Sequence, residues 1–579
     1  MQDTTVKTLP NPNESNLKKY FSYTMFQKPL FIFIIGFIVG FIMYGVVFDY
    51  NVVNPLYTDW IYDLAGDRAQ HDLGWRFFRR TEWQFPIGLI DGLTSDGAVS
   101  CTYSDSIPLL AIPFKLLSPI LPDEFQYFGL WELFTFSMMG GCSALLLRKF
   151  SKNPVFCAIG AIPFSASTTI VHRAFGHEAL SAQWIVIIAF LLFVTRDRKW
   201  KHKATPVVLW SLLGVTTALV HMYFIPMIYM VMAGYIFVDV IKDKKIVRPL
   251  LVFSITTLCT VATMYVIGVF YGDTPSREGG LGVYSANYNA LFNPIGCSKF
   301  LKPLNQWAGA RNGEGLGYLG LGIILLAFVS IILVFNKLVN GEKPFMTQIK
   351  EFVSKNWVTA LALILVFAGS FFVAASPKGA LNGRLLYDIQ YPEEIMNCLS
   401  IFRASGRFVW VPMYMVYTLS FAVISKLDSK KTSIFVITLC AAIQLLDLRD
   451  FFRGKREQVC ETEYNHELVL QGEEWNKMCA GKKEFIIGPL PNNYKAYTEV
   501  YFPFAEYAVE HDMNMSSFYL GRANYTNLKN YADEQFYMLY EGNGRDDAIY
   551  VFIDNKFVPE NQENFDIYEI GDFTVATAK

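Results

Sequence analysis

Long apolar segments alternate with short polar connections over most of the chain. A helix needs about 20 apolar residues to cross the hydrocarbon core of a bilayer, which is about 30 Å thick. Eleven segments come near this length, at residues 29–48, 125–147, 154–171, 179–195, 205–221, 222–241, 249–271, 315–335, 357–375, 407–425 and 433–448. The pattern predicts a polytopic α-helical membrane protein with about 11 transmembrane helices in residues 29–448.

The C-terminal residues 449–579 follow a different pattern. Extended runs at 484–488, 513–518 and 548–553 alternate with helical stretches near 499–511 and 527–540. This alternation is typical of an α/β unit with a parallel sheet, so we expect a small soluble domain here. Cys460 and Cys479 lie in it. The two cysteines could form a disulfide or remain free thiols, and the sequence does not decide between these alternatives because spacing alone does not fix the geometry.

Composition and charge placement agree with membrane embedding. Only 17% of residues are charged and 53% are hydrophobic, whereas about a quarter of the residues of a soluble domain are charged. The net charge of -1 gives no indication of nucleic-acid binding. Basic residues gather in alternate connections, which the positive-inside rule places in the cytoplasm. Residues 1–28 lack the pattern of a signal peptide and are expected to form a cytoplasmic tail, which after eleven crossings leaves 449–579 in the periplasm.

The connection 49–124 is rich in aromatic and polar residues and carries the first candidate site. An amphipathic helix is predicted over 68–80, at the membrane interface, and a proline-interrupted stretch at 107–121 is predicted as a second interfacial segment. Asp67 opens the first helix, His71 follows one turn later, and Asp59 lies upstream. An acid at this place could act as a general base. Asp67 with Gln70 also fits a capping box, and this alternative gives the acid a structural role alone.

Other polar groups stand at the ends of predicted spans. Asp105 could hold a sugar hydroxyl or could begin a turn before Pro108. The short connection 172–178 contains His172, Arg173, His177 and Glu178. Arg173 is a candidate for a lipid phosphate, and His177 with Glu178 for a sugar, although these residues could also simply face solvent. Their spacing is not a metal-ligand motif, and the nine cysteines form no CxxC pair.

Arginines on the expected outer side form a further candidate. Arg403 and Arg407 are four residues apart and share a helical face, with Arg384 upstream. Guanidinium groups suit a phosphate, and the positive-inside rule makes arginine unexpected here, so phosphate binding is favoured over snorkelling at the interface. The run 315–320 matches G-x-G-x-x-G. It opens a predicted span without a preceding strand, so helix packing explains it better than nucleotide binding.

Five segments carry a resemblance to a known superfamily: GDRAQHDLGWRFFRR, YSDSIPLLAIPFKLLSP, FQYFGLW, HRAFGHEALSAQW and FRASGRFVW. Together with the long outer loop and the terminal soluble domain, they resemble the GT-C membrane glycosyltransferases. More narrowly, essentially the whole chain is similar to a bacterial family whose layout resembles that of the Gtr-type O-antigen glucosyltransferases. The resemblance implies an acid of the first outer loop as base and a polyprenyl-phosphate or polyprenyl-pyrophosphate sugar as donor. By position, Asp67 is the first choice for that acid and Asp59 the second. Protein mannosyltransferases have Asp-Glu before a histidine there, so Asp67-Arg68 followed by His71 is a partial match.

The expected function is transfer of a sugar from a polyprenyl-phosphate donor to a periplasmic glycan or glycolipid, such as O-antigen lipopolysaccharide, at the bacterial inner membrane. In this reading Asp67 is the base, and the other candidates bind donor or sugar: His71, Asp105, His172, Arg173, His177, Glu178, Arg384, Arg403 and Arg407. No cofactor is expected, and a divalent metal is an alternative that the sequence does not favour. Two other functions stay open. A transporter or flippase of lipid-linked glycans needs charges in mid-membrane and a repeat of two halves, and neither is evident. A non-catalytic membrane protein would use its outer domain to bind a partner.

Overall fold

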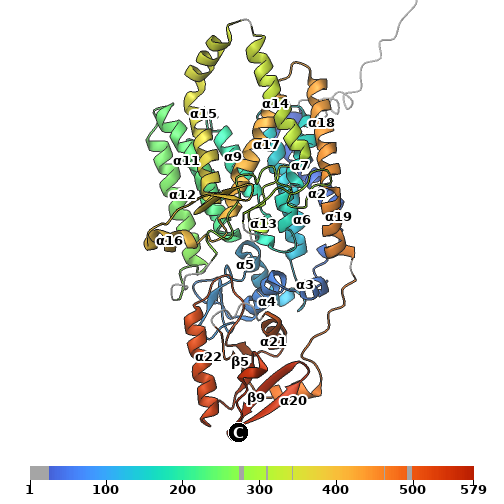
Figure 1. Ribbon diagram of the computed structural model, residues 1–579, viewed down its shortest axis with the longest axis vertical. Helices are drawn as coiled ribbons and strands as arrows, with labels where there is room; N and C mark the ends of the chain where they lie inside the picture. Colours follow the sequence, from blue (N-terminus) through green and yellow to red (C-terminus); the bar gives the residue numbers. More distant parts are fainter. Residues whose placement is uncertain (1–24, 273–279, 308–310, 342, 462, 492–497) are drawn as a thin grey trace, which may run out of the picture.

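The structure is a computed structural model that describes residues 25–272, 280–307, 311–341, 343–461, 463–491 and 498–579. A helical part and a smaller C-terminal sheet domain follow one another along the longest axis (Figure 1). Of the expected N-terminal tail, residues 1–24 lie outside the described residues, and η1 (Met25–Gln27) leads into the first long helix.

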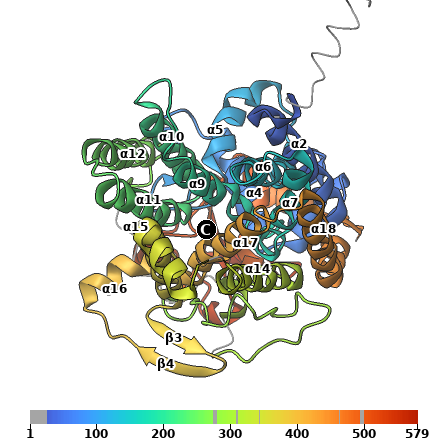
Figure 2. The same cartoon turned by 90° about the horizontal axis from the view of Figure 1, so that it is seen from above.

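Each of the eleven predicted apolar segments coincides with a helix or a pair of helices. They are α2 (Pro29–Val47), α6 (Phe128–Arg148), α7 (Pro154–Ser165) with α8 (Thr168–Arg173), α9 (Trp184–Val194), α10 (Thr205–Val220), α11 (Phe224–Ile241), α12 (Val247–Val266), α14 (Leu321–Val339), α15 (Phe345–Ala375), α17 (Trp410–Ile424) and α18 (Lys430–Asp447). Viewed from above, these helices form a bundle (Figure 2). The helical fold class is therefore confirmed.

Within the described residues, eight helical stretches are long and apolar enough to cross a membrane. They are 29–47, 128–148, 154–173, 224–241, 247–266, 321–339, 345–375 and 405–424. The stretches Glu178–Val194 and Thr205–Val220 are shorter, and α18 carries Lys430, Lys431 and Asp447 at its ends. Length and end charges thus separate the other three predicted spans from these eight.

Small residues allow the first two long helices to pack closely. A Cβ on Gly40 of α2 would lie 2.1 Å from the Phe136 carbonyl oxygen of α6, and one on Gly36 would lie 2.4 Å from that of Gly140. Close backbone approach of this kind is typical of helix pairs in membranes. The glycine-rich run 315–320 also serves packing, because a Cβ on Gly317 would lie 2.8 Å from the Val409 side chain and one on Gly320 would lie 1.9 Å from the Gln444 side chain of α18.

The connection between α2 and α6 folds over one end of the bundle, which we call the site end. It contains η2 (Asn51–Val53), α3 (Asp59–Leu64), α4 (Asp67–Arg80), β1 (Leu89–Ile90) paired antiparallel with β2 (Val99–Ser100), α5 (Pro108–Leu117) and η3 (Ser118–Ile120). Helix α4 buries Trp75, Phe77 and Phe78 inside the protein. The prediction that this helix lies in the membrane interface is therefore wrong, since its aromatic face packs against protein.

Shorter elements of the later connections lie at the same end. They are α13 (Arg311–Glu314), the antiparallel strands β3 (Lys378–Leu381) and β4 (Arg384–Asp388), α16 (Glu393–Ser400) and η5 (Ser405–Val409). Figure 2 shows β3, β4 and α16 at the rim of the molecule, outside the bundle of long helices.

The C-terminal domain is a mixed α/β unit. After α19 (Arg449–Arg456) and η6 (Glu457–Glu461), it contains α20 (Glu473–Cys479), β5 (Glu484–Gly488), α21 (Thr498–Glu510), β6 (Asn514–Met515), α22 (Tyr525–Tyr540), β7 (Ala548–Phe552), η8 (Asn555–Phe557), β8 (Phe565–Ile570) and β9 (Phe573–Ala578). The strand order is β6-β5-β7-β9-β8. The first three strands are parallel, as predicted, whereas β8 and β9 add an antiparallel hairpin. Cys460 and Cys479 are both free.

Backbone hydrogen bonds connect this domain to the α2–α6 connection. Met515 N–H donates to the Gly92 carbonyl at 2.9 Å, Ser95 N–H to Ser516 at 3.0 Å, and Gly521 N–H to Tyr103 at 2.7 Å. The first two bonds lie at the edge strand β6 and the residue that follows it. The C-terminal domain therefore contacts the part of this connection between α4 and Asp105.

Candidate functional site

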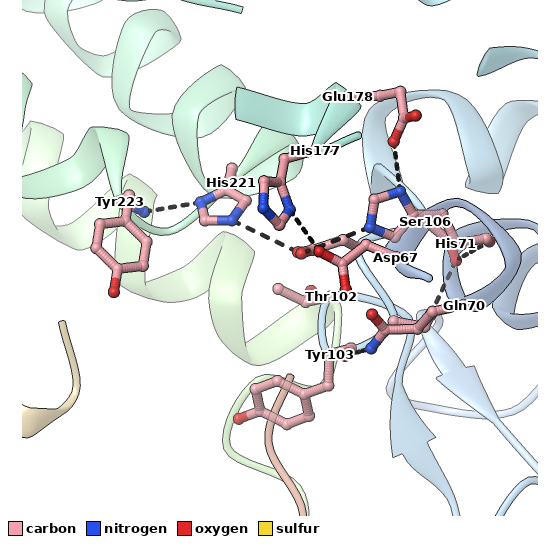
Figure 3. A network of polar contacts seen from close by, with 12 residues as sticks. Asp67, Gln70, His71, Thr102, Tyr103, Ser106, His177, Glu178, His221 and Tyr223 are labelled. Carbon is pink, nitrogen blue, oxygen red and sulfur yellow. Dashed lines mark hydrogen bonds and ion pairs between the residues drawn. The ribbon is translucent and has the colours of Figure 1, made fainter. Parts of the chain in front are cut away.

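Four segments that are distant in sequence meet at the site end (Figure 3). Helix α4 brings Asp67 and His71, the turn before α5 brings Asp105, and the connection after α8 brings His177 and Glu178. His221, which was not among the predicted site residues, joins them from the turn between α10 and α11. The structure thus brings five of the predicted site residues into one group of acids and histidines.

His71 and Glu178 form a buried pair. The Nδ1 atom of His71 lies 2.5 Å from a carboxylate oxygen of Glu178, and each side chain is only 1% exposed. Burial lowers the pKa of His71, but the charge and hydrogen bond of Glu178 outweigh it, so the pKa is raised overall. The other ring nitrogen, Nε2, is buried without a hydrogen bond and lies 3.9 Å from Asp105. Glu178 therefore fixes the ring so that Nε2 faces the centre of the group.

Asp105 stands between two histidine rings. Its carboxylate lies 3.9 Å from His71 Nε2 and 3.5 Å from His221 Nε2. The Tyr223 N–H donates to His221 Nδ1 at 3.1 Å, so the proton of a neutral His221 is on Nε2, facing Asp105. Asp105 has a φ of +52°, a left-handed conformation that is costly for a residue with a Cβ and that clusters at functional sites. The predicted turn before Pro108 explains the backbone conformation of Asp105. The rings of His71 and His221 explain the position of its side chain.

Asp67 pairs with His177 instead of capping its helix. The distance from its carboxylate to His177 Nδ1 is 2.9 Å, and the two side chains are 27% and 30% exposed. The N-cap of α4 is Gly66 and makes no side-chain cap, so the capping-box prediction is wrong. Burial raises the pKa of Asp67, but hydrogen bonds from His177 and from Tyr519 of the C-terminal domain hold it well below its usual range. The acid is therefore ionised and about a quarter exposed to solvent.

Glu314, at the end of α13, holds two of the predicted phosphate-binding arginines. Its carboxylate lies 2.8 Å from Arg173 and 2.6 Å from Arg407. Burial raises the pKa of Glu314, but both guanidinium groups hold it well below its usual range. Sequence reasoning missed this acid, because nothing in the long connection 272–314 marks it as the partner of residues more than 90 positions away.

Two cations near the group are less completely neutralised. Lys455 of α19 and Arg68 of α4 form no ion pair among the described residues, and the Nε atom of Arg68 is buried without a hydrogen bond. Burial and the nearby charges of Arg68 and Arg173 lower the pKa of Lys455 to about 8. Positive charges that repel each other in a partly buried place are the arrangement expected of an anion site. Neither residue was among the predicted site residues.

The remaining predicted residues lie around this group or away from it. His172 lies in the last turn of α8 beside Arg173, with its ring next to Gly313, and Arg403 is half-buried just before η5. Asp59 begins the separate helix α3, and Arg384 is exposed on β4 at the rim (Figure 2). In the described part of the chain, neither of these two makes an ion pair with the histidines of the group.

Metal ligation finds no support in the geometry of the described residues. Among them, no group of three or more His, Cys, Asp or Glu side chains is arranged to hold a metal ion. The proton on His221 Nε2 also leaves that nitrogen without a lone pair for a metal.

The fold and the site define a helical protein with several apolar helices of membrane-spanning length and a C-terminal α/β domain over a polar site. Comparison with protein families makes the assignment more specific. A family model described as "Domain of unknown function (DUF6311)" matches residues 37–449, and the "DUF6311 C-terminal domain" matches residues 474–578. The chain therefore belongs to the DUF6311 family. No curated protein matches it.

Proposed function

We propose that the protein is an inverting membrane glycosyltransferase of the GT-C type that uses a polyprenyl-phosphate sugar. The observation that carries the proposal is the meeting of an ionised, partly exposed acid, Asp67, with two cations that form no ion pair among the described residues, Lys455 and Arg68, at one end of apolar helices. Inverting transfer needs a base for the acceptor hydroxyl and positive charge for the leaving phosphate.

The topology that goes with this proposal has eleven spans. Helices α9, α10 and α18 then cross the membrane together with the eight longer stretches. The basic connections lie in the cytoplasm, and the site end and the C-terminal domain lie in the periplasm of a bacterial inner membrane. Helix α18 fits this direction, since Lys430 and Lys431 begin it and Asp447 ends it at the site end.

Asp67 is proposed as the base. It takes the proton of the acceptor hydroxyl while that oxygen attacks the anomeric carbon, and the electron pair of the breaking carbon–oxygen bond leaves with the polyprenyl phosphate. His177 orients the carboxylate from one side at 2.9 Å. His71, held by Glu178, and His221 present ring nitrogens on either side of Asp105, where sugar hydroxyls can form hydrogen bonds.

The donor phosphate is proposed to bind Lys455 and Arg68. This differs from the sequence-based expectation, in which Arg173, Arg403 and Arg407 hold it. The reason is that Arg173 and Arg407 already form ion pairs with Glu314. Lys455 and Arg68 supply positive charge that the described carboxylates do not pair with.

Replacing Lys455 with alanine is expected to weaken donor binding about 10- to 100-fold, because a hydrogen bond to a charged group contributes about 1.5–3 kcal/mol. The pKa of Lys455 is about 8. The wild-type protein should therefore lose donor affinity between pH 7 and pH 9, as the lysine loses its proton, whereas Lys455→Arg should retain it. Calorimetric titration with a short-chain polyprenyl-phosphate sugar measures both effects. Lys477→Ala, at a 78% exposed position of α20, is the matched control. Equal affinity of Lys455→Ala and the wild type would contradict the assignment.

The proposed reaction is tested with membranes that contain the full-length protein and a radiolabelled polyprenyl-phosphate sugar. A transferase moves label into a glycan or glycolipid fraction and releases polyprenyl phosphate. Movement of the intact labelled lipid between leaflets without transfer would instead indicate a flippase. If the folded protein shows neither transfer nor movement of the lipid, the enzyme is rejected, and a binding role for the C-terminal domain remains.

A further inference from the structure

Three segments at the rim of the site end expose large apolar side chains. We call them the rim elements: the loop 292–304, the β3–β4 hairpin and helix α16. Their large apolar side chains that are 37–56% exposed are Phe292, Phe300, Leu301, Leu304, Leu381, Leu385, Leu386 and Ile395. Soluble monomers rarely expose an apolar surface of this extent without a partner.

The rim elements are fixed at the ends of long helices. Lys299 N–H donates to the carbonyl of Asp447, the last residue of α18, at 2.8 Å. Tyr288 N–H donates to Ala380 of β3 at 2.8 Å, and the Tyr288 ring stacks on Phe371 in the last turns of α15. The elements therefore lie at the level at which α15 and α18 end, and they project outward from the bundle (Figures 1 and 2).

The pattern of each element fits a boundary between hydrocarbon and water. In α16, Ile395, Cys398 and Leu399 are spaced for one helical face, whereas Glu393, Glu394 and Asn397 are polar. In the loop 292–304, exposed Lys299 and Lys302 flank Phe300 and Leu301. Aromatic rings, aliphatic side chains and lysines that extend toward headgroups are the composition of interfacial segments.

We infer that the rim elements lie on the lipid surface, with their apolar side chains in the headgroup and upper acyl region of the leaflet at the site end. The occupant is lipid, because the exposed apolar surface continues onto the long helices. Helix α15, whose Phe372 ring stacks on Tyr387 of β4, exposes Ile364, Leu365 and Phe372, and it is one of the eight stretches apolar enough to cross a membrane. The inference rests on the membrane topology of the proposed function but not on sugar transfer.

This arrangement gives the rim elements a role that α4 was expected to have. The aromatic face of α4 is enclosed by protein, so it is not available to a lipid surface. The rim elements would set how deep the protein sits, and with it the height of the site above the lipid phosphates.

Fluorescence depth measurement tests this inference. Cys398 is the exposed member of the nine cysteines, and replacing the half-buried Cys259 and Cys460 with serine leaves it as the accessible thiol. The full-length protein, labelled at Cys398 with an environment-sensitive dye, is placed in vesicles of phosphatidylethanolamine and phosphatidylglycerol. Leu386→Cys on β4, in a Cys398→Ser background, provides an independent reporter. We expect doxyl-labelled lipids to quench both dyes about twofold or more, and aqueous iodide to quench them only weakly.

Two control positions separate the possible failures. Tyr537→Cys on α22, 64% exposed, should be quenched by iodide and not by lipid, and Leu258→Cys on α12, 68% exposed, should show the reverse. If the rim dyes behave like Tyr537→Cys, the inference is overturned. Protection from both quenchers would also overturn it, because protein, such as a second copy of the chain, would then cover the rim. If Leu258→Cys escapes the lipid quencher, the membrane topology itself fails.

Discussion

Asp67→Asn is expected to lower the rate of sugar transfer about 10²- to 10⁴-fold while donor binding persists, because general bases contribute about this factor. The amide keeps nearly the same size and can still accept a hydrogen bond from His177, which lies 2.9 Å away. Only the capacity to take a proton is lost. The measurement is single-turnover transfer from a radiolabelled polyprenyl-phosphate sugar by purified protein, next to an equilibrium titration with the donor.

The pH dependence of the transfer rate provides a second test of Asp67. Because the pKa of Asp67 is held well below its usual range, the carboxylate is ionised throughout pH 5–7. Protonation of this acid should therefore cause no loss of rate on the acidic side of that window. Asp123→Asn, in an exposed turn of the same connection, is the matched control. Undiminished turnover of Asp67→Asn would remove this residue from the role, and Asp59→Asn would then test the other acid.

Glu314→Gln is expected to destabilise the protein by about 3–5 kcal/mol, since removing one partner of a buried ion pair leaves the other charge without compensation. Here two guanidinium groups lose their partner at once, and Arg173 and Arg407 are only 3% and 10% exposed. The pKa of Glu314 is held well below its usual range, so the stability that the ionised carboxylate contributes to the fold is fully present at pH values above the ordinary glutamate pKa. It is lost as the pH falls through the lowered value. A lower apparent melting temperature in detergent at pH 7 measures the effect.

An exposed ion pair offers the control for this variant. Glu351 pairs with Lys343, and both side chains are 56% exposed. Such pairs contribute at most about 1 kcal/mol, so Glu351→Gln should leave the melting temperature nearly unchanged. If Glu314→Gln and Glu351→Gln have the same melting temperature, Glu314 does not hold the arginines in the way that the structure indicates. Inorganic phosphate gives a further check, because it should stabilise Glu314→Gln more than the wild type by pairing with the two arginines.

The long helices could be predicted from sequence because their signal is local. A run of apolar residues determines a helix of this kind without reference to distant parts of the chain. The boundaries of the parallel strands β5 and β7 followed from the same kind of pattern. The hairpin β8–β9 was missed, although its residues 565–578 also alternate between buried and exposed over part of their length.

The site was predictable only where its residues carry a signal within a few positions. Asp67, His71, Asp105 and the connection 172–178 were found because polar residues stand beside apolar runs. Glu314, Lys455 and His221 were not assigned, because the charged groups near them are remote in sequence and only packing brings them together. The placement of α4 failed for the same physical reason. An amphipathic face indicates that something apolar covers it, and here the cover is the protein itself.

The backbone hydrogen bonds between the α2–α6 connection and β6 can form only late in the synthesis of the chain. Met515 and Ser516 pair with Gly92 and Ser95, and Tyr519 contacts Asp67, although more than 400 residues separate these partners. During synthesis, every long helix emerges before the strand that completes the site. The nascent chain therefore holds an unfinished site until residues 514–521 have been made and have docked. Before that point the long helices have been made, but Asp67 lacks its contact with Tyr519.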